Sequence, residues 1–308
     1  MATEQLELDW AKDPNHHLIC RGSRDYPELL GQIPGPPERL YVAGNLDALH
    51  MPSLAIVGSR NPTSQGRRNA YEFARYLGRS GFCIVSGLAQ GIDTAAHEGA
   101  LDGGAMTIAF LGHGIDRVYP PSNRELAARI AMQGALCSEF VMGTAPRREH
   151  FPVRNRLISG LSLGTLVVEA ATRSGSLISA RLAGEQGREI FAIPGSIHNP
   201  LSRGCHRLIR QGAKLVESGA DIVSELGPLV RHLMQAPVEA GASAATAPGK
   251  DTNYEVLLDL LGFDPATADE LSARSGLTID QVSSMLLILE LEGKVESQAG
   301  GRYSRLHG

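Results

Sequence analysis

The sequence predicts an α/β protein: an extended Rossmann-like domain with a mostly parallel sheet and helices on both faces, plus a small C-terminal winged-helix domain. Three observations predict this fold. Short apolar runs recur along the first two thirds of the chain, stretches with helical spacing separate them, and the chain closes with helix, turn, helix and a hairpin. Because strands covered on both faces read as continuous apolar runs, the alternation indicates a parallel sheet.

Each predicted strand ends in a turn rich in glycine or polar residues. The runs that predict strands cover residues 54–57, 83–85, 106–111, 135–138, 165–170 and 189–193, with a further candidate at 40–44. Helical spacing covers residues 65–80, 123–133 and 177–186. Since parallel strands point the same way, their turns meet at the carboxyl edge of the sheet, where open α/β folds bind ligands.

The turn after residue 85 indicates what this edge suits. Ser86 and Gly87 end a predicted strand, and a helical stretch follows. Gly87 permits a sharp turn, and Gly91 permits close approach to a ligand or to another element. A helix that begins at such a turn offers backbone N–H groups to a phosphate. A plain strand–helix connection is the alternative interpretation, and neither G-x-G-x-x-G nor a Walker A pattern is present.

The composition limits the possible functions. A chain of 308 residues, 43% of them hydrophobic, has room for one large and one small domain. The formal net charge is −4, so any anion site must be a local patch. Only four of the 29 basic residues are lysine. Arginine suits phosphates and bases, although codon bias is the favoured explanation of the excess.

The cysteines and the termini give further expectations. The four cysteines are far apart without a C-x-x-C pair, so we expect no disulfide framework, zinc site or cofactor. No signal peptide and no long apolar run is present. We therefore expect a cytoplasmic protein without a membrane partner.

An arginine-rich stretch with one aromatic residue is the second informative segment. Within ten positions lie Arg147, Arg148, Phe151, Arg154 and Arg156. Guanidinium groups hold a nucleic-acid backbone and a ring stacks a base, so the pattern predicts a platform for a single strand. We expect Phe151 in an exposed loop. In the alternative interpretation the ring is core and the arginines are solvated or paired with nearby acids, which are Glu139, Glu149 and Glu169.

Catalytic candidates form no convincing set. Asp93 and His97 lie four residues apart on one predicted helix, which suits an acid/base pair. We favour the alternative, in which Asp93 orients the preceding turn and His97 packs inside. No G-x-S-x-G pattern is present. The turn Arg173-Ser174-Gly175 is a further candidate anion cradle.

Several of these motifs together resemble a known family. In order they are Gly58-Ser59-Arg60, Ser86-Gly87-Leu88-Ala89-x-Gly91-Ile92-Asp93, Tyr119-Pro120, Phe151-Pro152-x-Arg154-Asn155-Arg156, Ser174-Gly175-Ser176 and Pro194-Gly195. From about residue 26 to 226 the chain is similar to the bacterial DNA-processing protein A family (DprA, also called Smf). The end of the chain is similar to the winged helix that many members carry.

The resemblance implies a function and a site. It implies single-stranded DNA binding, a homodimer, and loading of RecA onto incoming DNA in natural transformation with displacement of single-strand-binding protein, without catalysis. Its pocket matches Arg60, the Ser86-Gly87 turn, a basic residue at Arg147 or Arg148, and Phe151. With the candidates above, the predicted DNA-binding set is Ser59, Arg60, Ser86, Gly87, Arg147, Arg148, Phe151, Arg154, Arg156, Arg173, Ser174 and Gly175.

The expected organisation follows. Residues 1–49 form a lead-in, 50–234 the Rossmann-like DNA-binding domain, 235–251 a flexible linker rich in Ala, Pro, Gly and Ser, and 252–308 the winged helix. From residue 250 onward ten acidic residues oppose five basic ones. Because phosphate contacts dominate DNA affinity, this balance favours a partner-binding or weak DNA-binding role for the last domain.

The alternative function is an enzyme, a nucleotide-processing Rossmann protein similar to the lysine-decarboxylase-like phosphoribohydrolases. Those carry a P-G-G-x-G-T-x-x-E signature. The comparable turn here, residues 173–177, lacks the glycine run and the acid. The sequence therefore disfavours the enzyme.

Overall fold

The computed structural model describes residues 2–235, 250–261, 265–291, 293–298 and 301–305. It divides into two compact units, each described by itself below. The first comprises Met1–Gly78 with Phe82–Ile222, and the second Arg79–Gly81 with Val223–Gly308. The boundaries of the predicted domains remain a proposal, and most of the predicted linker, residues 236–249, lies outside the described residues.

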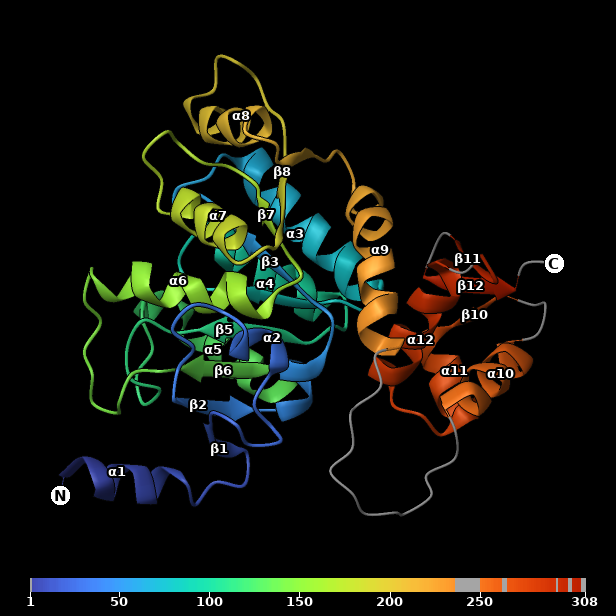
Figure 1. Ribbon diagram of the computed structural model, residues 1–308, viewed down its shortest axis with the longest axis horizontal. Coiled ribbons are helices and arrows are strands. Elements are labelled where there is room, and N and C mark those ends of the chain that lie inside the picture. The colour runs from blue at the N-terminus through green and yellow to red at the C-terminus, as the bar shows by residue number, and fades with distance from the viewer. Residues whose placement is uncertain (1, 236–249, 262–264, 292, 299–300, 306–308) are drawn as a thin grey trace. The chain divides into compact units, whose positions relative to one another are not determined.

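The first unit is built on one nine-stranded sheet with the order β1-β2-β6-β5-β4-β3-β7-β8-β9 (Figure 1). Every pair from β6 to β9 is parallel, whereas β1 pairs with β2, and β2 with β6, in antiparallel fashion. The sheet is thus mostly parallel, as predicted. The strands are β1 (His16–Cys20), β2 (Arg39–Gly44), β3 (Ser53–Val57), β4 (Cys83–Ser86), β5 (Thr107–Phe110), β6 (Ala135–Ser138), β7 (Gly164–Val167), β8 (Glu189–Ala192) and β9 (Lys214–Leu215).

The lead-in is part of this sheet. Its residues 40–44 fall in β2, and β1 was not predicted at all. The reason is that β1 is an edge strand in which only Ile19 is buried, so its sequence shows no apolar run. Strands β3 to β7 are buried along their whole length, which explains the clear apolar runs in their sequences. The short strand β9 has no buried residue and was not predicted either.

Helices cover both faces. One hydrophobic cluster joins sheet residues such as Val85 and Phe110 to α6 and α7, through residues such as Leu157 and Ala180. The opposite cluster joins Ala109 to α4 and α5. The helices of this unit are α1 (Ala2–Trp10), α2 (Glu28–Gly31), α3 (Ser64–Arg79), α4 (Ile92–Asp102), α5 (Arg124–Gln133), α6 (His150–Leu161), α7 (Ser176–Glu185) and α8 (Arg203–Arg210), with 3-10 turns η1 (Leu46–His50), η2 (Pro121–Asn123) and η3 (Pro200–Ser202).

One helix corrects an expectation. Phe151 was expected in a loop, but α6 begins at His150 and includes it. Pro152 suggested a loop, yet proline is compatible with the first turn of a helix, where its missing N–H breaks no intrahelical bond. The ring of Phe151 is half-buried in this first turn rather than fully exposed.

The second unit has a winged-helix architecture. Helix α9 (Gly219–Gln235) runs into it, followed by α10 (Lys250–Leu261), α11 (Ala268–Ser275) and α12 (Ile279–Leu291). The predicted hairpin is present as β11 (Val295–Gln298) and β12 (Arg302–Arg305), and β10 (Ala266–Thr267) adds a third antiparallel strand. Thr267 and Glu270 form a capping box that starts α11, and residues of all these helices except α9 share one core with the strands.

None of the helices in the described part of the chain combines the length and the apolar character that a membrane span requires.

Candidate nucleic-acid interface

The carboxyl ends of β3, β4, β5 and β7 form one rim, because these strands are parallel neighbours in the sheet. The turn after β3 carries Ser59 and Arg60, and the turn after β4 begins at Gly87. The first turn of α6 brings Phe151 to the same rim, with the backbone of Gly112 beyond β5 next to its ring. The rim is therefore built from four segments that are far apart in the sequence, which are residues 58–60, 87–91, 112–119 and 150–151.

An arginine–aromatic cluster occupies the rim. The guanidinium carbon of Arg60 lies 5.2 Å from the centroid of the Phe151 ring, and that of Arg154 lies 5.9 Å from it. The ring of Tyr119 lies 5.9 Å from that of Phe151, tilted by 37°. Residues from three separate stretches therefore meet at one aromatic ring. Such contacts between guanidinium groups and aromatic rings are attractive and hold both groups in place.

Arg154 is buried and serves the interior of the cluster. Arg154 is only 3% exposed, and its guanidinium donates a hydrogen bond to the backbone oxygen of Phe110. Burial lowers the pKa of Arg154 to about 10, while the nearby Asp93 carboxylate favours the charged form. The structure thus does not present Arg154 to a ligand directly, although it lies beside the Phe151 ring.

The Ser86-Gly87 turn is occupied by the chain's own carboxylate. The N–H groups of Gly87 and Ala89 donate to Oδ2 of Asp93 at 3.2 and 3.3 Å, and the Ser86 hydroxyl donates to the oxygen of Ile56. The N–H groups expected to receive a phosphate therefore already have an acceptor. Asp93 orients the turn, as favoured from the sequence, and burial raises its pKa against the opposing effect of Arg154.

The two glycines are required by close packing inside the rim. A Cβ on Gly87 would collide with the guanidinium of Arg154. Gly91 has φ +87°, and a Cβ there would collide with the backbone oxygens of Ser59 and Arg60. Gly91 thus allows approach to another element, the second of the two roles proposed for it.

The remaining predicted arginines differ in exposure. Arg60, Arg147 and Arg148 are exposed, and no salt bridge joins them to an acid within the described residues. Arg156 is half-buried and forms an ion pair with Glu139. Glu169, considered as a partner for an arginine, instead accepts hydrogen bonds from Thr63. That pairing could not be seen from the sequence, because 106 residues separate the two.

The turn after β7 lies at the same rim. Arg173 and Gly175 are exposed, and the hydroxyls of Ser174 and Ser176 lie 2.7 Å apart in a mutual hydrogen bond. The Ser59 hydroxyl accepts from the N–H of Asn61 at 3.1 Å.

A polar groove of about 630 Å³ extends from Arg60 between the starts of α3 and α4. Its walls carry more polar than apolar groups, including Arg67, which pairs with Glu98 at 3.1 Å. The groove is lined by Arg60, Asn61, Pro62, Thr63, Ser64, Arg67, Gln90, Gly91, Thr94, Glu98, Ser122 and Asn123.

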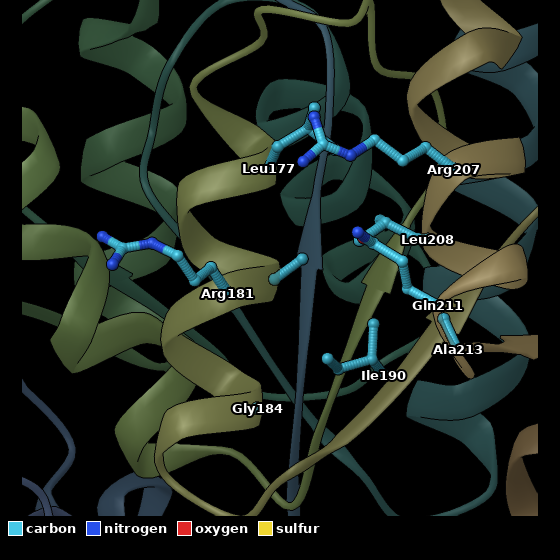
Figure 2. A pocket seen from close by; sticks show the side chains of 9 residues that line it. Leu177, Arg181, Gly184, Ile190, Arg207, Leu208, Gln211 and Ala213 are labelled. Carbon is cyan, nitrogen blue, oxygen red and sulfur yellow. The ribbon is translucent and has the colours of Figure 1, made fainter.

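A second cavity is different in character. It measures about 290 Å³ and lies between α7, α8 and β8, with Arg181 and Arg207 projecting from the two helices (Figure 2). Its walls are mainly apolar, from Leu177, Ile190 and Leu208 among others. None of the predicted DNA-binding residues lines it.

The catalytic candidates do not form a reactive pair. His97 is fully buried, and burial lowers its pKa to about 3, so the imidazole is neutral at ordinary pH. The Thr107 hydroxyl donates to the oxygen of Ile84 at 2.6 Å, so Nδ1 of His97 must be the donor in its 2.7 Å bond to Thr107. Within the described residues, no three His, Cys, Asp or Glu side chains group to hold a metal ion.

Sequence reasoning missed two participants. Tyr119 was part of a quoted motif but had no assigned role, and it is 44% exposed beside Phe151. His150 stacks on Phe140 and bonds the oxygen of Gly112, which anchors the start of α6. An exposed tyrosine near a proline turn was the only available signal for the first.

Fold and rim together define a class: a doubly wound α/β protein with a cationic and aromatic rim, which also carries a winged-helix domain. Comparison with family models gives the same class. The model described as DNA recombination-mediator protein A matches residues 17–227, and that described as the DprA winged helix domain matches residues 241–301. The chain belongs to the DNA recombination-mediator protein A family, which confirms the resemblance seen in its motifs.

Individual relatives agree. Protein Smf of Escherichia coli (strain K12) is 44% identical over 303 residues, which cover 98% of this chain and 80% of that protein. The crystal structure of DNA processing protein A from Streptococcus pneumoniae superposes with a TM-score of 0.67 at 45% identity, covering 72% of this chain and 77% of that chain. A structure from Helicobacter pylori, described as giving insights into the unique single-stranded DNA binding mode of DNA processing protein A, superposes with a TM-score of 0.62 at 30% identity, covering 68% and 95%.

Proposed function

We propose that this chain is a non-enzymatic DNA-processing protein that binds single-stranded DNA at the rim of its sheet. One observation carries the proposal. The exposed Arg60 lies 5.2 Å from the half-buried Phe151 ring, so a phosphate-binding group and a base-stacking surface are adjacent. The H. pylori relative is described by its single-stranded DNA binding mode, which supports the same ligand here.

The rim residues divide the work of binding. Arg60 leaves the ring and pairs with a phosphate, while a base stacks on Phe151 in its place. Stacking of this kind is worth about 1–3 kcal/mol per base and tolerates any sequence. Arg147 and Arg148, just before α6, and Arg173 after β7 supply further exposed positive charge for neighbouring phosphates.

Buried groups support this surface rather than touch DNA. Asp93 holds the Gly87 turn, and Arg154 lies between that turn and the Phe151 ring. Arg156, also on α6, is held by Glu139, which directly follows β6. We therefore assign direct DNA contact to the exposed arginines and a positioning role to Arg154.

The cellular role follows from the family. We propose a role in natural transformation, in which the protein forms a homodimer in the cytoplasm, displaces single-strand-binding protein and loads RecA onto incoming DNA. The membership in a recombination-mediator family supports this role. The buried, neutral His97 argues against the alternative of a nucleotide-processing enzyme, because Asp93 and His97 cannot act as an acid/base pair at the rim.

The test is binding of fluorescent single-stranded and duplex oligonucleotides across a salt series. We expect tighter binding to the single strand, with log affinity falling by about 0.7 per phosphate contact for each unit of log salt. Arg60→Glu and Arg148→Glu should weaken binding more than tenfold. Arg129→Glu is the matched control, because Arg129 pairs with Asp102 at the end of α4 that points away from the rim. Unchanged affinity in a folded Arg60→Glu, Arg148→Glu double variant would show that the rim is not the binding site.

A further inference from the structure

The point where the strand order reverses is the usual ligand position in a doubly wound sheet. Here β3 connects to β4 on one side, whereas β7 lies on its other side, so the reversal falls between β3 and β7. Ligand phosphates in such folds sit at this crevice, at the start of the helix that follows the first strand. In this chain that helix is α3, and it begins beside the turn after β7.

A carboxylate of the chain fills this position. Glu169, two residues after β7, is 7% exposed. Its two oxygens accept from Thr63, one from the backbone N–H at 2.8 Å and one from the hydroxyl at 2.6 Å. The Thr63 hydroxyl oxygen in turn accepts a hydrogen bond from the N–H of Gly66 at 3.0 Å. This bond caps the start of α3.

The packing shows that the space is shaped for this group. A Cβ on Gly66 would collide with the Glu169 carboxylate. In a capping box, the third residue of the helix is a glutamate that bonds the capping residue's N–H. Here that third residue is Gly66, and Glu169 supplies the carboxylate from a distant part of the chain.

We propose that Glu169 determines ligand selection by occupying the phosphate position at the start of α3, so that the phosphate of a free nucleotide cannot enter the crevice between β3 and β7. A polynucleotide instead binds at the exposed arginines and Phe151 of the rim, outside this crevice. This exclusion of free phosphate by Glu169 does not depend on the DNA affinity of the rim.

The experiment replaces the carboxylate with a free anion. Glu169→Ala removes the group but leaves the donors of Thr63, and melting temperatures are measured in sodium phosphate and in sodium chloride at equal ionic strength. At about ten times its dissociation constant, phosphate should raise the melting temperature of Glu169→Ala by about 3–6 °C more than that of the wild type. A merely structural loss would lower stability equally in both salts.

Two further variants sharpen the outcome. Glu169→Gln keeps the shape and fills the space, so phosphate should give it no extra stabilisation. Glu72→Ala removes a glutamate of α3 that is exposed and pairs with Arg75, and it should behave like the wild type. If Glu169→Ala folds only in phosphate, the inference is supported in its strongest form. If it fails to fold in both salts, or gains nothing from phosphate, the inference is wrong.

The DNA measurement is separate. Single-stranded DNA affinity of Glu169→Gln should stay within about threefold of the wild type, since Glu169 lies outside the arginine–aromatic cluster. A wild type that failed to bind DNA would overturn the proposed function, yet it would leave the phosphate result intact.

Discussion

At the scale of single residues, burial separates the arginines of the rim into two roles. Arg60 and Arg148 are exposed, whereas Arg154 is enclosed by Gly87, Phe110 and Phe151. A buried charge needs a partner, and Asp93 is the acid whose field favours the charged form of Arg154. In the proposed interface, the same guanidinium chemistry thus serves phosphate binding at one position and the placement of neighbouring groups at another.

The two roles predict different salt dependences. Arg60→Ala removes a phosphate contact and should make the slope of log affinity against log salt shallower by about 0.7. Arg154→Lys keeps the charge but loses the flat group beside the ring, so affinity should fall about three- to tenfold with an unchanged slope. Gly87→Ala displaces the same guanidinium and should give the same result. A slope change in Arg154→Lys would instead identify it as a phosphate ligand.

His97 predicts a pH dependence of stability. Its pKa in the folded protein is about 3, below the ordinary 6.5, because burial disfavours the charged imidazole. Below pH 6.5 the unfolded chain therefore takes up a proton that the folded chain does not. The free energy of unfolding should fall by about 1.4 kcal/mol per pH unit between about pH 6 and pH 4 from this group alone.

The measurement is denaturant unfolding of the wild type and His97→Gln across that range. The variant should be less stable at pH 7, and its stability should decline less steeply as the pH falls. Parallel curves for the two proteins would show that His97 does not titrate as its burial requires.

At the scale of elements, the turns after β3 and β4 interlock. The N–H of Ile92 donates to the oxygen of Ser59 at 3.1 Å, and a Cβ on Gly58 would collide with the Ile92 side chain. Gly91 packs from the other side against the backbone oxygens of Ser59 and Arg60. The start of α4 thereby fixes the turn that carries Arg60.

Gly91→Ala tests this interlock. The new Cβ meets two backbone oxygens, and φ of +87° is strained for alanine, so the free energy of unfolding should fall by about 1–3 kcal/mol. Because the displaced turn carries Arg60, DNA affinity should fall and the salt slope should become shallower. Gly104→Ala is the control, since Gly104 also has positive φ but has no neighbour within 4 Å of its Cβ and lies after α4. It should lose stability without losing DNA affinity.

At the scale of the whole molecule, charge is distributed unevenly. The net charge is −4, and the chain from residue 250 onward has ten acidic and five basic residues. The exposed arginines named above all belong to the first unit. DNA affinity is therefore expected to come from the first unit, with the winged helix left to bind a partner.

Removing residues 251–308 tests this division. Single-stranded DNA affinity of the truncated protein should stay within about threefold of the full chain at about 0.15 M salt, and should rise slightly at low salt because an acidic segment is gone. A loss of more than tenfold would make the winged helix a DNA-binding element.

Much of the fold could be predicted because buried strands leave a local signal. Runs such as 54–57 and 83–85 are apolar throughout, and they reappear as β3 and β4. Strand β1 could not be predicted, because this edge strand buries only Ile19. The helical conformation of Phe151 could not be predicted either, because the neighbouring Pro152 is typical of a loop. A contact between distant parts of the chain, such as Glu169 with Thr63, has no local signal at all, whereas the role of Asp93 at the Gly87 turn, six residues away, could be predicted.

The contact between the Arg60 guanidinium and the Phe151 ring has a consequence for selectivity among polyanions. Without DNA the guanidinium of Arg60 lies against the ring, and Phe151 is half-buried, so less apolar surface is exposed to water. Heparin and polyphosphate can form an ion pair with the Arg60 guanidinium, but they have no planar aromatic group to stack on Phe151. If DNA binds as proposed, a polymer with both a charged backbone and planar bases should displace Arg60 from Phe151 more readily than these polymers, so the site should select nucleic acid without reading any base.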